Sequence, residues 1–237
     1  MDRFRYAQFC PIARAAEILG QRWMLLVFRE LFGGPQRFSD LQRRLSSVSS
    51  SVLAERLAAL EEAGLVSRRT LPPPAGASVY ELTDDGRAFE PALLEITRWG
   101  LRLMTPPRPG DHLEPEWVRI GVRAFARRSP APARRFELRM PGDPEPVSVR
   151  VAGGEAGTTL LEADAPVDAT LTAPPLVILG LLSGGLDPDQ AVRDGAVAVD
   201  GDASLLADLP RLFDVLPHPP DSDAEPSDSP TNERNPT

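Results

Sequence analysis

The sequence predicts an α+β protein with two domains and a polar tail. Residues 1–105 combine apolar residues at helical spacing with two short strand-like segments, and residues 111–217 combine short alternating strands with apolar helices. Between them lies Thr105-Pro-Pro-Arg-Pro-Gly110, a composition typical of a stiff linker. Residues 218–237 contain no aliphatic side chain beyond Ala224, so we expect them to be disordered.

Charge is distributed unevenly along the 237 residues. Every one of the 26 Lys+Arg positions is arginine, and the net charge is −8. Residues 1–105 carry 14 Arg against 12 Asp and Glu, whereas residues 106–217 carry 11 against 17. Binding to nucleic acid depends on a local basic patch. The overall acidity therefore does not exclude DNA binding by the first domain, but it indicates that the second domain stays away from phosphates.

The first domain is expected to contain a helix-turn-helix. A short helix that begins near Ser39, which we expect to cap it, is followed by a serine-rich turn and a helix with one apolar stripe, Leu53, Leu57 and Leu60. In a helix-turn-helix the second helix presents its N-terminal residues to the major groove. The predicted helices cover residues 12–19, 21–32, about 39–45 and 51–63.

Two strands after these helices predict a β-hairpin wing. They cover residues 66–71 and 78–83, and Arg68 and Arg69 of the first strand are placed to contact phosphates. The same pattern also fits an ordinary helical domain whose serines merely cap a helix. The residues that we expect to contact DNA are Arg37, Arg43, Arg44, Ser49, Ser50, Ser51, Arg56, Arg68 and Arg69.

The helix after the wing carries a broad apolar stripe, which favours a homodimer. The alternative is that the stripe covers the domain's own core. Pro91 fits this region if a new helix begins there. The predicted dimerisation residues are Phe89, Leu93, Ile96, Trp99 and Leu103.

The second domain is predicted to form one antiparallel sheet with helices on one side. Its expected strands cover residues 135–140, 147–151, 158–162, 168–172 and 197–200, and its expected helices cover residues 115–128, 176–182, 187–193 and 204–215.

Several segments of the first domain resemble the HxlR-type winged-helix regulators in order and spacing. They are Cys10-Pro-Ile-Ala, Ile18-Leu-Gly-Gln-Arg-Trp23, Arg37-Phe-Ser-Asp-Leu41, Leu60-Glu-Glu-Ala-Gly-Leu-Val66, Val79-Tyr-Glu-Leu-Thr-Asp-Asp-Gly86 and Trp99-Gly100. The match covers about residues 8–104, and Arg22 stands where the family usually has lysine. The resemblance implies a dimer that binds a palindromic operator. It also places Cys10 where some members carry a redox-sensing thiol, although a cysteine merely packed on the first helix is the alternative.

The second domain resembles the sterol-carrier-protein-like (SCP2-type) domains, most clearly from Asp168 onward. The segments that carry this resemblance include Asp168-Ala-Thr-Leu-Thr172 and Gly195-Ala-Val-Ala-Val-Asp-Gly-Asp202. It implies a cavity for an apolar effector, with Leu176, Leu179, Leu182 and Phe213 as candidate wall residues. The alternative is that these side chains form an ordinary filled core.

The sequence lacks the motifs of an enzyme or a cofactor protein. His112 and His218 with a single cysteine make no metal set, and no nucleophile elbow, phosphate loop or dinucleotide fingerprint occurs. The lone cysteine, the charged N-terminus and the lack of a membrane-length apolar run favour a cytoplasmic location and no membrane contact. We therefore expect a regulator that binds double-stranded DNA, without cofactor or metal. The alternative is a lipid-binding module whose winged helix serves protein interaction.

Overall fold

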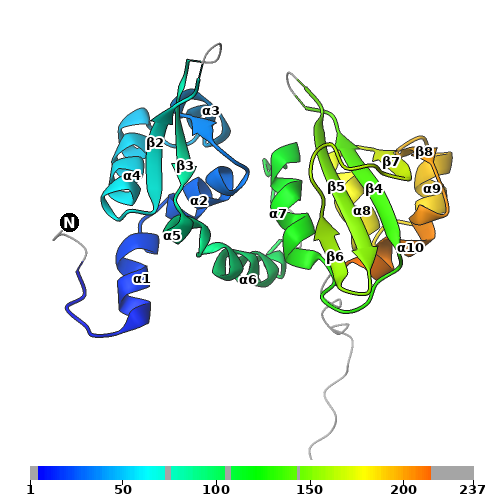
Figure 1. The fold of residues 1–237 in the computed structure, drawn as a ribbon, viewed down its shortest axis with the longest axis horizontal. Coiled ribbons are helices and arrows are strands. Elements are labelled where there is room, and N and C mark those ends of the chain that lie inside the picture. Colours follow the sequence, from blue (N-terminus) through cyan, green and yellow to red (C-terminus); the bar gives the residue numbers. More distant parts are fainter. Residues whose placement is uncertain (1–4, 73–75, 105–107, 143–144, 215–237) are drawn as a thin grey trace, which may run out of the picture.

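The computed structural model describes residues 5–72, 76–104, 108–142 and 145–214. These residues form two α+β domains, which meet where helix α6 packs on helix α7 (Figure 1). The predicted linker lies partly, and the predicted tail wholly, outside the described residues.

The first domain has a helical part and a small wing sheet. The apolar stripe of α4 is buried as predicted, because Leu53, Leu57 and Leu60 are each at most 1% exposed. The strands pair antiparallel in the order β1-β3-β2. The elements are α1 (Pro11–Leu19), α2 (Met24–Phe32), β1 (Gln36–Arg37), α3 (Phe38–Arg44), α4 (Ser50–Glu62), β2 (Val66–Thr70), β3 (Ser78–Leu82), α5 (Asp84–Arg87) and α6 (Glu90–Leu101).

One predicted helix start in this domain was wrong, and one capping residue was misassigned. Helix α2 begins at Met24 because Trp23 adopts a φ of 81°, in the left-handed region, which interrupts any helix from residue 21. Ser39 lies inside α3, whose N-cap is Arg37, because β1 keeps Arg37 extended until the helix begins. Ser49 is the residue that caps α4, accepting a hydrogen bond from the backbone N–H of Val52 at 3.3 Å.

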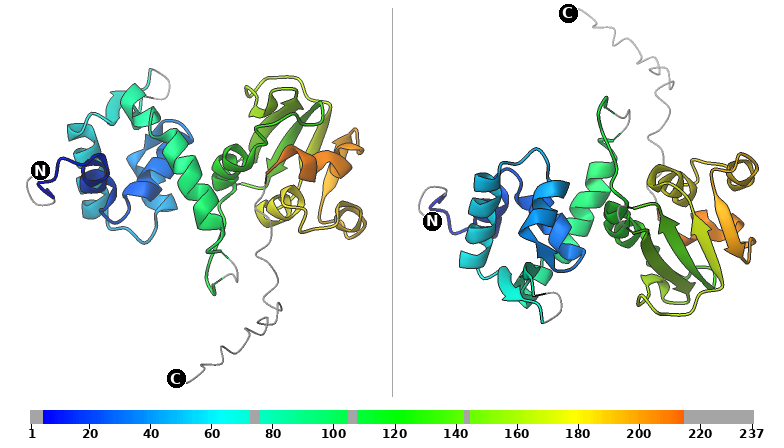
Figure 2. Two further views of the ribbon diagram at one scale, coloured as in Figure 1. Left: turned by 90° about the horizontal axis from the view of Figure 1, so that it is seen from below. Right: turned by 90° about the horizontal axis from the view of Figure 1, so that it is seen from above.

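The second domain packs four helices against a five-stranded sheet. Alternate residues of β4 face the helices, so Phe136, Leu138 and Met140 share one core with Val122 of α7 and Leu181 of α8. Figure 2 shows the helices gathered on one side of the sheet. The elements are α7 (Pro115–Phe125), β4 (Arg134–Met140), β5 (Val147–Gly154), β6 (Gly157–Leu160), β7 (Ala169–Thr172), α8 (Pro175–Leu182), α9 (Pro188–Arg193), β8 (Ala198–Gly201) and α10 (Leu205–Leu212).

The sheet is mixed, not purely antiparallel as the sequence suggested. Its order is β6-β5-β4-β7-β8, and β4 pairs in parallel with β7, with Phe136 opposite Ala169. Parallel neighbours need a long crossover, and here the β5–β6 hairpin supplies it. Strand β5 already occupies one edge of β4, so β7 adds to the other edge.

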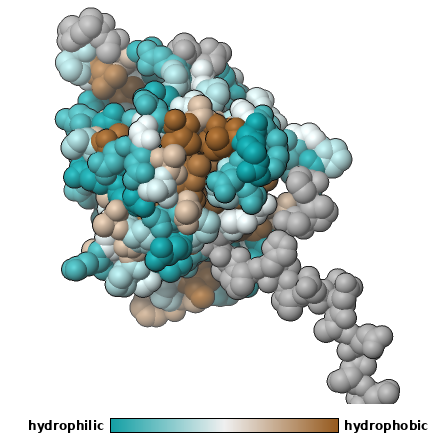
Figure 3. All heavy atoms as spheres, turned by 90° about the vertical axis from the view of Figure 1, so that its right-hand side faces the viewer, coloured by the Kyte–Doolittle hydropathy of each residue, from teal (hydrophilic) through white to brown (hydrophobic). Residues whose placement is uncertain are grey.

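The end of the described chain closes the second domain. After α10, the backbone N–H of Asp214 donates to the carbonyl of Phe125, and the hydroxyl of Thr158 donates to the carbonyl of Leu212 at 2.6 Å. Seen from the side that α9 and α10 occupy, apolar side chains gather in the middle of the face, with polar ones around them (Figure 3). Among the described residues of this domain, the large apolar side chains that stay exposed are Leu176, Leu186 and Val192.

Candidate DNA interface and domain junction

The first turn of α4 is exposed and rich in small hydroxyl side chains. The Ser49 side chain caps the helix and lies 3.1 Å from the hydroxyl of Ser51, while Ser50 and Ser51 are both exposed. Ala54 and Ala58 continue this exposed face further along the helix. Small side chains at a helix N-terminus let backbone N–H groups approach an anion closely. This face can therefore lie against a phosphate backbone or a groove.

The wing carries two exposed arginines, and each makes an exposed contact with a neighbouring side chain. Arg68 donates to the hydroxyl of Ser78 at 2.7 Å, and Arg69 pairs with Glu81 at 2.7 Å. Both contacts run across the β2–β3 hairpin, and the Arg69 side chain is 46% exposed. Exposed pairs of this kind contribute little to stability, so both guanidinium groups can exchange their partners for phosphates at low cost.

The remaining arginines of the predicted DNA surface differ in their availability. Arg37 is exposed at the end of β1, and Arg43 is 59% exposed beside Asp40. Arg56 is only 13% exposed, because its Nε donates to the carbonyl of Arg22 at 3.1 Å. Arg56 therefore ties α4 to the turn before α2.

Arg44 points toward the second domain. Its Nη2 lies 2.8 Å from Glu116 Oε1 on α7, and its Nη1 lies 3.6 Å from Glu30 Oε2 on α2. The side chain of Arg44 is 17% exposed. Among the arginines predicted to contact DNA, Arg44 is the one that the structure places at the junction between the domains.

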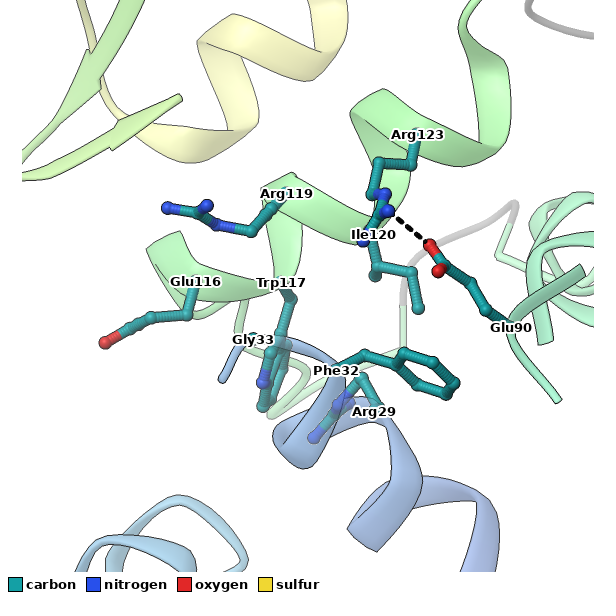
Figure 4. Close-up of a pocket in the computed structure, with 9 residues that line it drawn as sticks. All are labelled: Arg29, Phe32, Gly33, Glu90, Glu116, Trp117, Arg119, Ile120 and Arg123. Carbon is teal, nitrogen blue, oxygen red and sulfur yellow. Dashed lines mark ion pairs between the residues drawn. The ribbon is translucent and has the colours of Figure 1, made fainter. Parts of the chain in front are cut away.

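The junction is centred on Glu30 and Trp117. Glu30 is 2% exposed, and its Oε1 accepts hydrogen bonds from Arg29 at 2.7 Å and from the indole nitrogen of Trp117 at 2.9 Å. The Arg29 guanidinium also stacks 3.7 Å from the centre of the Trp117 ring (Figure 4). Burial lowers the pKa of Arg29 below its ordinary value, while Glu30 acts in the opposite direction.

A small hollow adjoins this cluster. It has a volume of about 20 Å³ and is lined by Arg29, Phe32 and Trp117, among others, with the Glu90–Arg123 ion pair at one side (Figure 4). That volume holds about one water molecule. This hollow therefore has room for a water molecule but not for a larger ligand.

The predicted dimerisation residues divide into two groups. Leu93 is 4% exposed in the core of the first domain, and Phe89 packs on Phe28 with 4.9 Å between ring centres. In contrast, Ile96, Trp99 and Leu103 are 38%, 62% and 58% exposed. The stripe therefore serves both the domain's own core and an outward surface.

The candidate wall residues of the ligand pocket differ in how far they are buried. Leu182 and Phe213 are 4% and 2% exposed within the second core, whereas Leu176 is 70% exposed at the surface and Leu179 is half-buried. Cys10, the candidate sensor, is half-buried at the residue before α1. In the part of the chain that the structure describes, no group of three or more His, Cys, Asp or Glu is placed to hold a metal ion.

Sequence reasoning missed the junction. Glu30 is a lone carboxylate within the apolar helix Met-Leu-Leu-Val-Phe-Arg-Glu-Leu-Phe, which was the available signal. Its partner Trp117 lies 87 residues away, and no sequence pattern connects the two. Gln42 was also missed; its side-chain amide donates to the carbonyl of Val48 at 2.6 Å and holds the turn between α3 and α4.

Comparison with known proteins identifies both domains. Residues 18–107 match the HxlR-like helix-turn-helix model, and residues 126–214 match the SCP-2 sterol transfer family. An uncharacterised HTH-type transcriptional regulator of Bacillus subtilis, YvaP, is 39% identical over 101 residues, which cover 42% of this chain and 94% of that protein. The chain belongs to the HxlR family.

Further relatives of this HxlR-family chain are regulators too. The HTH-type transcriptional regulator YodB of Bacillus subtilis is 34% identical over 41% of this chain and 88% of its own length. The solved reduced form of YodB covers 44% of this chain and all of that protein, with 33% identity and a TM-score of 0.36. These relatives are named as transcriptional regulators. In the described part of the chain, no helix is long and apolar enough to cross a membrane.

Proposed function

We propose that this chain binds DNA as a homodimer at a palindromic operator and that its second domain holds an apolar effector. The observation that carries the DNA-binding proposal is the exposed first turn of α4, with Ser50 and Ser51 outward, together with exposed Arg68 and Arg69 on the wing. In this arrangement the helix start approaches the major groove while the wing arginines hold the backbone.

The homodimer is supported by apolar exposure on two helices. Trp99 of α6 is 62% exposed and Ile12 of α1 is 80% exposed, and Phe9, just before α1, is fully exposed. Large apolar side chains gathered in one small domain favour a protein partner. A two-fold dimer would present two α4 helices to successive half-sites, about one helical turn of DNA apart.

The apolar effector is supported by the SCP-2 match and by the exposed apolar side chains of the second domain. Leu176 and Leu186 remain exposed beside the buried core of this domain. Such exposed apolar side chains can contact an acyl-like ligand. Solvent extraction of the purified protein, followed by mass spectrometry, tests whether it carries an apolar molecule.

A gel-shift titration tests the DNA-binding proposal. The purified chain is titrated against the DNA upstream of its own gene, at two salt concentrations, with random-sequence DNA as the control. We expect selective binding whose affinity falls steeply with salt, because each phosphate contact releases counterions. Binding to upstream and distant genomic fragments no tighter than to random DNA would contradict the proposal. Such a result, with an extracted apolar molecule, would favour the lipid-binding module.

The variant Arg68→Ala sharpens this experiment. We expect weaker binding to every sequence and a salt slope reduced by about 1, because one phosphate contact is lost. The matched control is Arg211→Ala, an arginine of the second domain that is 70% exposed and pairs only with Asp208 among the described residues. A loss confined to particular base sequences would show that Arg68 reads bases instead.

A further inference from the structure

Glu30 joins three helices from two domains. Its carboxylate, on α2, accepts from Trp117 of α7 at 2.9 Å and faces Arg44 of α3 at 3.6 Å. Arg29, the preceding residue on α2, holds the same carboxylate at 2.7 Å. All of these groups are largely buried, since the side chains of Glu30, Arg44 and Arg29 are 1%, 17% and 20% exposed.

We propose that Glu30 is a positioning residue that couples the second domain to the helix-turn-helix. Through Trp117 it fixes α7, and through Arg44 it fixes the last turn of α3, next to the turn that leads into α4. Operator affinity then depends on how α7 is seated, although α7 itself contacts no DNA. This inference rests on the proposed DNA binding.

The contacts of Arg44 show how a movement of α7 can reach α3 and α4. Arg44 pairs with Glu116 of α7 at 2.8 Å, so α7 holds α3 by an ion pair as well as by way of Glu30. At the other end of the same turn, Gln42 binds the carbonyl of Val48, just before the Ser49 cap of α4. A shift of α7 is therefore transmitted to α3 and to the start of α4 through directly contacting groups.

Because the junction is buried, its hydrogen bonds and ion pairs are expected to form or break together. A carboxylate that loses its donors inside protein carries a large desolvation cost. If α7 moves, Glu30 and Arg44 must gain water or new partners together. The junction therefore favours two discrete arrangements of the domains over a graded movement.

A double-mutant cycle on the full chain tests the coupling. Glu30→Gln keeps an acceptor but removes the charge, and Trp117→Phe keeps an aromatic ring over Arg29 but removes the indole N–H. We expect the unfolding equilibrium constant of the double variant, measured in urea, to differ about tenfold from the product of the two single effects, because the variants share one hydrogen bond to a charged group. Additive effects would overturn the proposal.

The matched control is His112→Ala. The His112 ring lies 5.3 Å from the Trp117 ring and is exposed, and it does not touch Glu30. We expect this variant to show no coupling with Glu30→Gln. Equal coupling for both variants would mean that the cycle reports general packing around Trp117, which would also overturn the proposal.

Operator affinity provides a measurement that a purely structural role would leave unchanged. At a temperature where every variant is folded, we expect Trp117→Phe to lower the affinity for the operator about fivefold or more, while His112→Ala leaves it unchanged. An unchanged affinity in Trp117→Phe would overturn the transmission to DNA. If the wild-type chain binds no operator, the proposed function fails, and the unfolding cycle alone decides whether Glu30 joins the two domains.

Discussion

Among the described residues, two glutamates are buried and bind nearly the same kinds of partner. Glu30 at the domain junction and Glu137 on strand β4 are each 2% exposed, and each binds two arginines and one neutral donor. The neutral donor is the indole of Trp117 for Glu30 and the hydroxyl of Ser148, at 2.7 Å, for Glu137. The two sites differ in how far the partners lie along the chain and in how buried the arginines are.

The partners of Glu137 lie close to it in the sequence, and its arginines are partly exposed. Its partners Arg139, Ser148 and Arg150 lie within the β4–β5 hairpin, and the side chains of Arg139 and Arg150 are 47% and 24% exposed. At Glu30, in contrast, the partners come from three helices and the arginines are at most 20% exposed. Arg139 is half exposed and can turn to water when it loses Glu137, whereas both arginines at Glu30 are largely buried. The comparison indicates that Glu137 stabilises one hairpin, whereas Glu30 stabilises the arrangement of two domains.

The largest change in the free energy of unfolding is expected when the carboxylate of Glu30 or of Glu137 is removed. Glu30→Ala leaves Arg29 buried without its carboxylate partner and leaves Arg44 paired with Glu116 alone, so we expect the free energy of unfolding to fall by about 3–5 kcal/mol. Glu137→Ala leaves two arginines that can turn to water, and we expect a loss of about 1–3 kcal/mol. Urea denaturation of both variants measures the difference. Equal losses would mean that the exposure of the arginines does not decide the cost.

A smaller change in stability is expected when acid protonates Glu137. Burial raises the pKa of Glu137, but hydrogen bonds from Ser148, Arg139 and Arg150 lower it by more, so the pKa lies below its ordinary value. The unfolded chain then binds a proton at higher pH than the folded chain does. The contribution of Glu137 to stability is therefore complete above the ordinary glutamate pKa of about 4.3 and is lost as pH falls through the lower folded pKa.

The variant Glu137→Gln isolates this contribution. We expect its unfolding free energy to depend less on pH than that of the wild type below about pH 4.3, because the titrating group is gone. Denaturation at a series of acidic pH values measures both proteins. Parallel pH profiles would show that other carboxylates account for the acid sensitivity.

The smallest change in the free energy of unfolding is expected when the hydroxyl of Ser148, the neutral donor to Glu137, is removed. Ser148→Ala removes one hydrogen bond to Glu137 while both arginines remain, so we expect a loss of about 0.5–1.5 kcal/mol near neutral pH. The pKa of Glu137 should rise at the same time toward its value in the unfolded chain, so the stability that Glu137 loses in acid becomes smaller. An NMR titration of the Glu137 carboxyl group follows the pKa. A pKa that does not move would assign its depression to the arginines alone.

Local patterns accounted for most elements of the fold. The stripe of Leu53, Leu57 and Leu60 predicted α4, and the alternation of Phe136, Leu138 and Met140 predicted β4 and its buried face. These predictions succeed because each depends on residues within one helix or strand. The parallel pairing of β4 with β7 escaped prediction, since alternation within a strand does not reveal the direction of its neighbour.

The sequence by itself determined the two families, the helix-turn-helix with its wing and the buried faces of individual elements such as α4 and β4. Only the tertiary structure decided which of the predicted arginines remain exposed. Arg68 and Arg44 are equally plausible phosphate ligands in the sequence, but Arg68 is exposed on the wing, whereas Arg44 is held by Glu116 on the other domain. Sequence spacing reports which side chains share a face of one element. The burial and partners of a charged group depend on contacts between distant elements, and those contacts exist only in the folded chain.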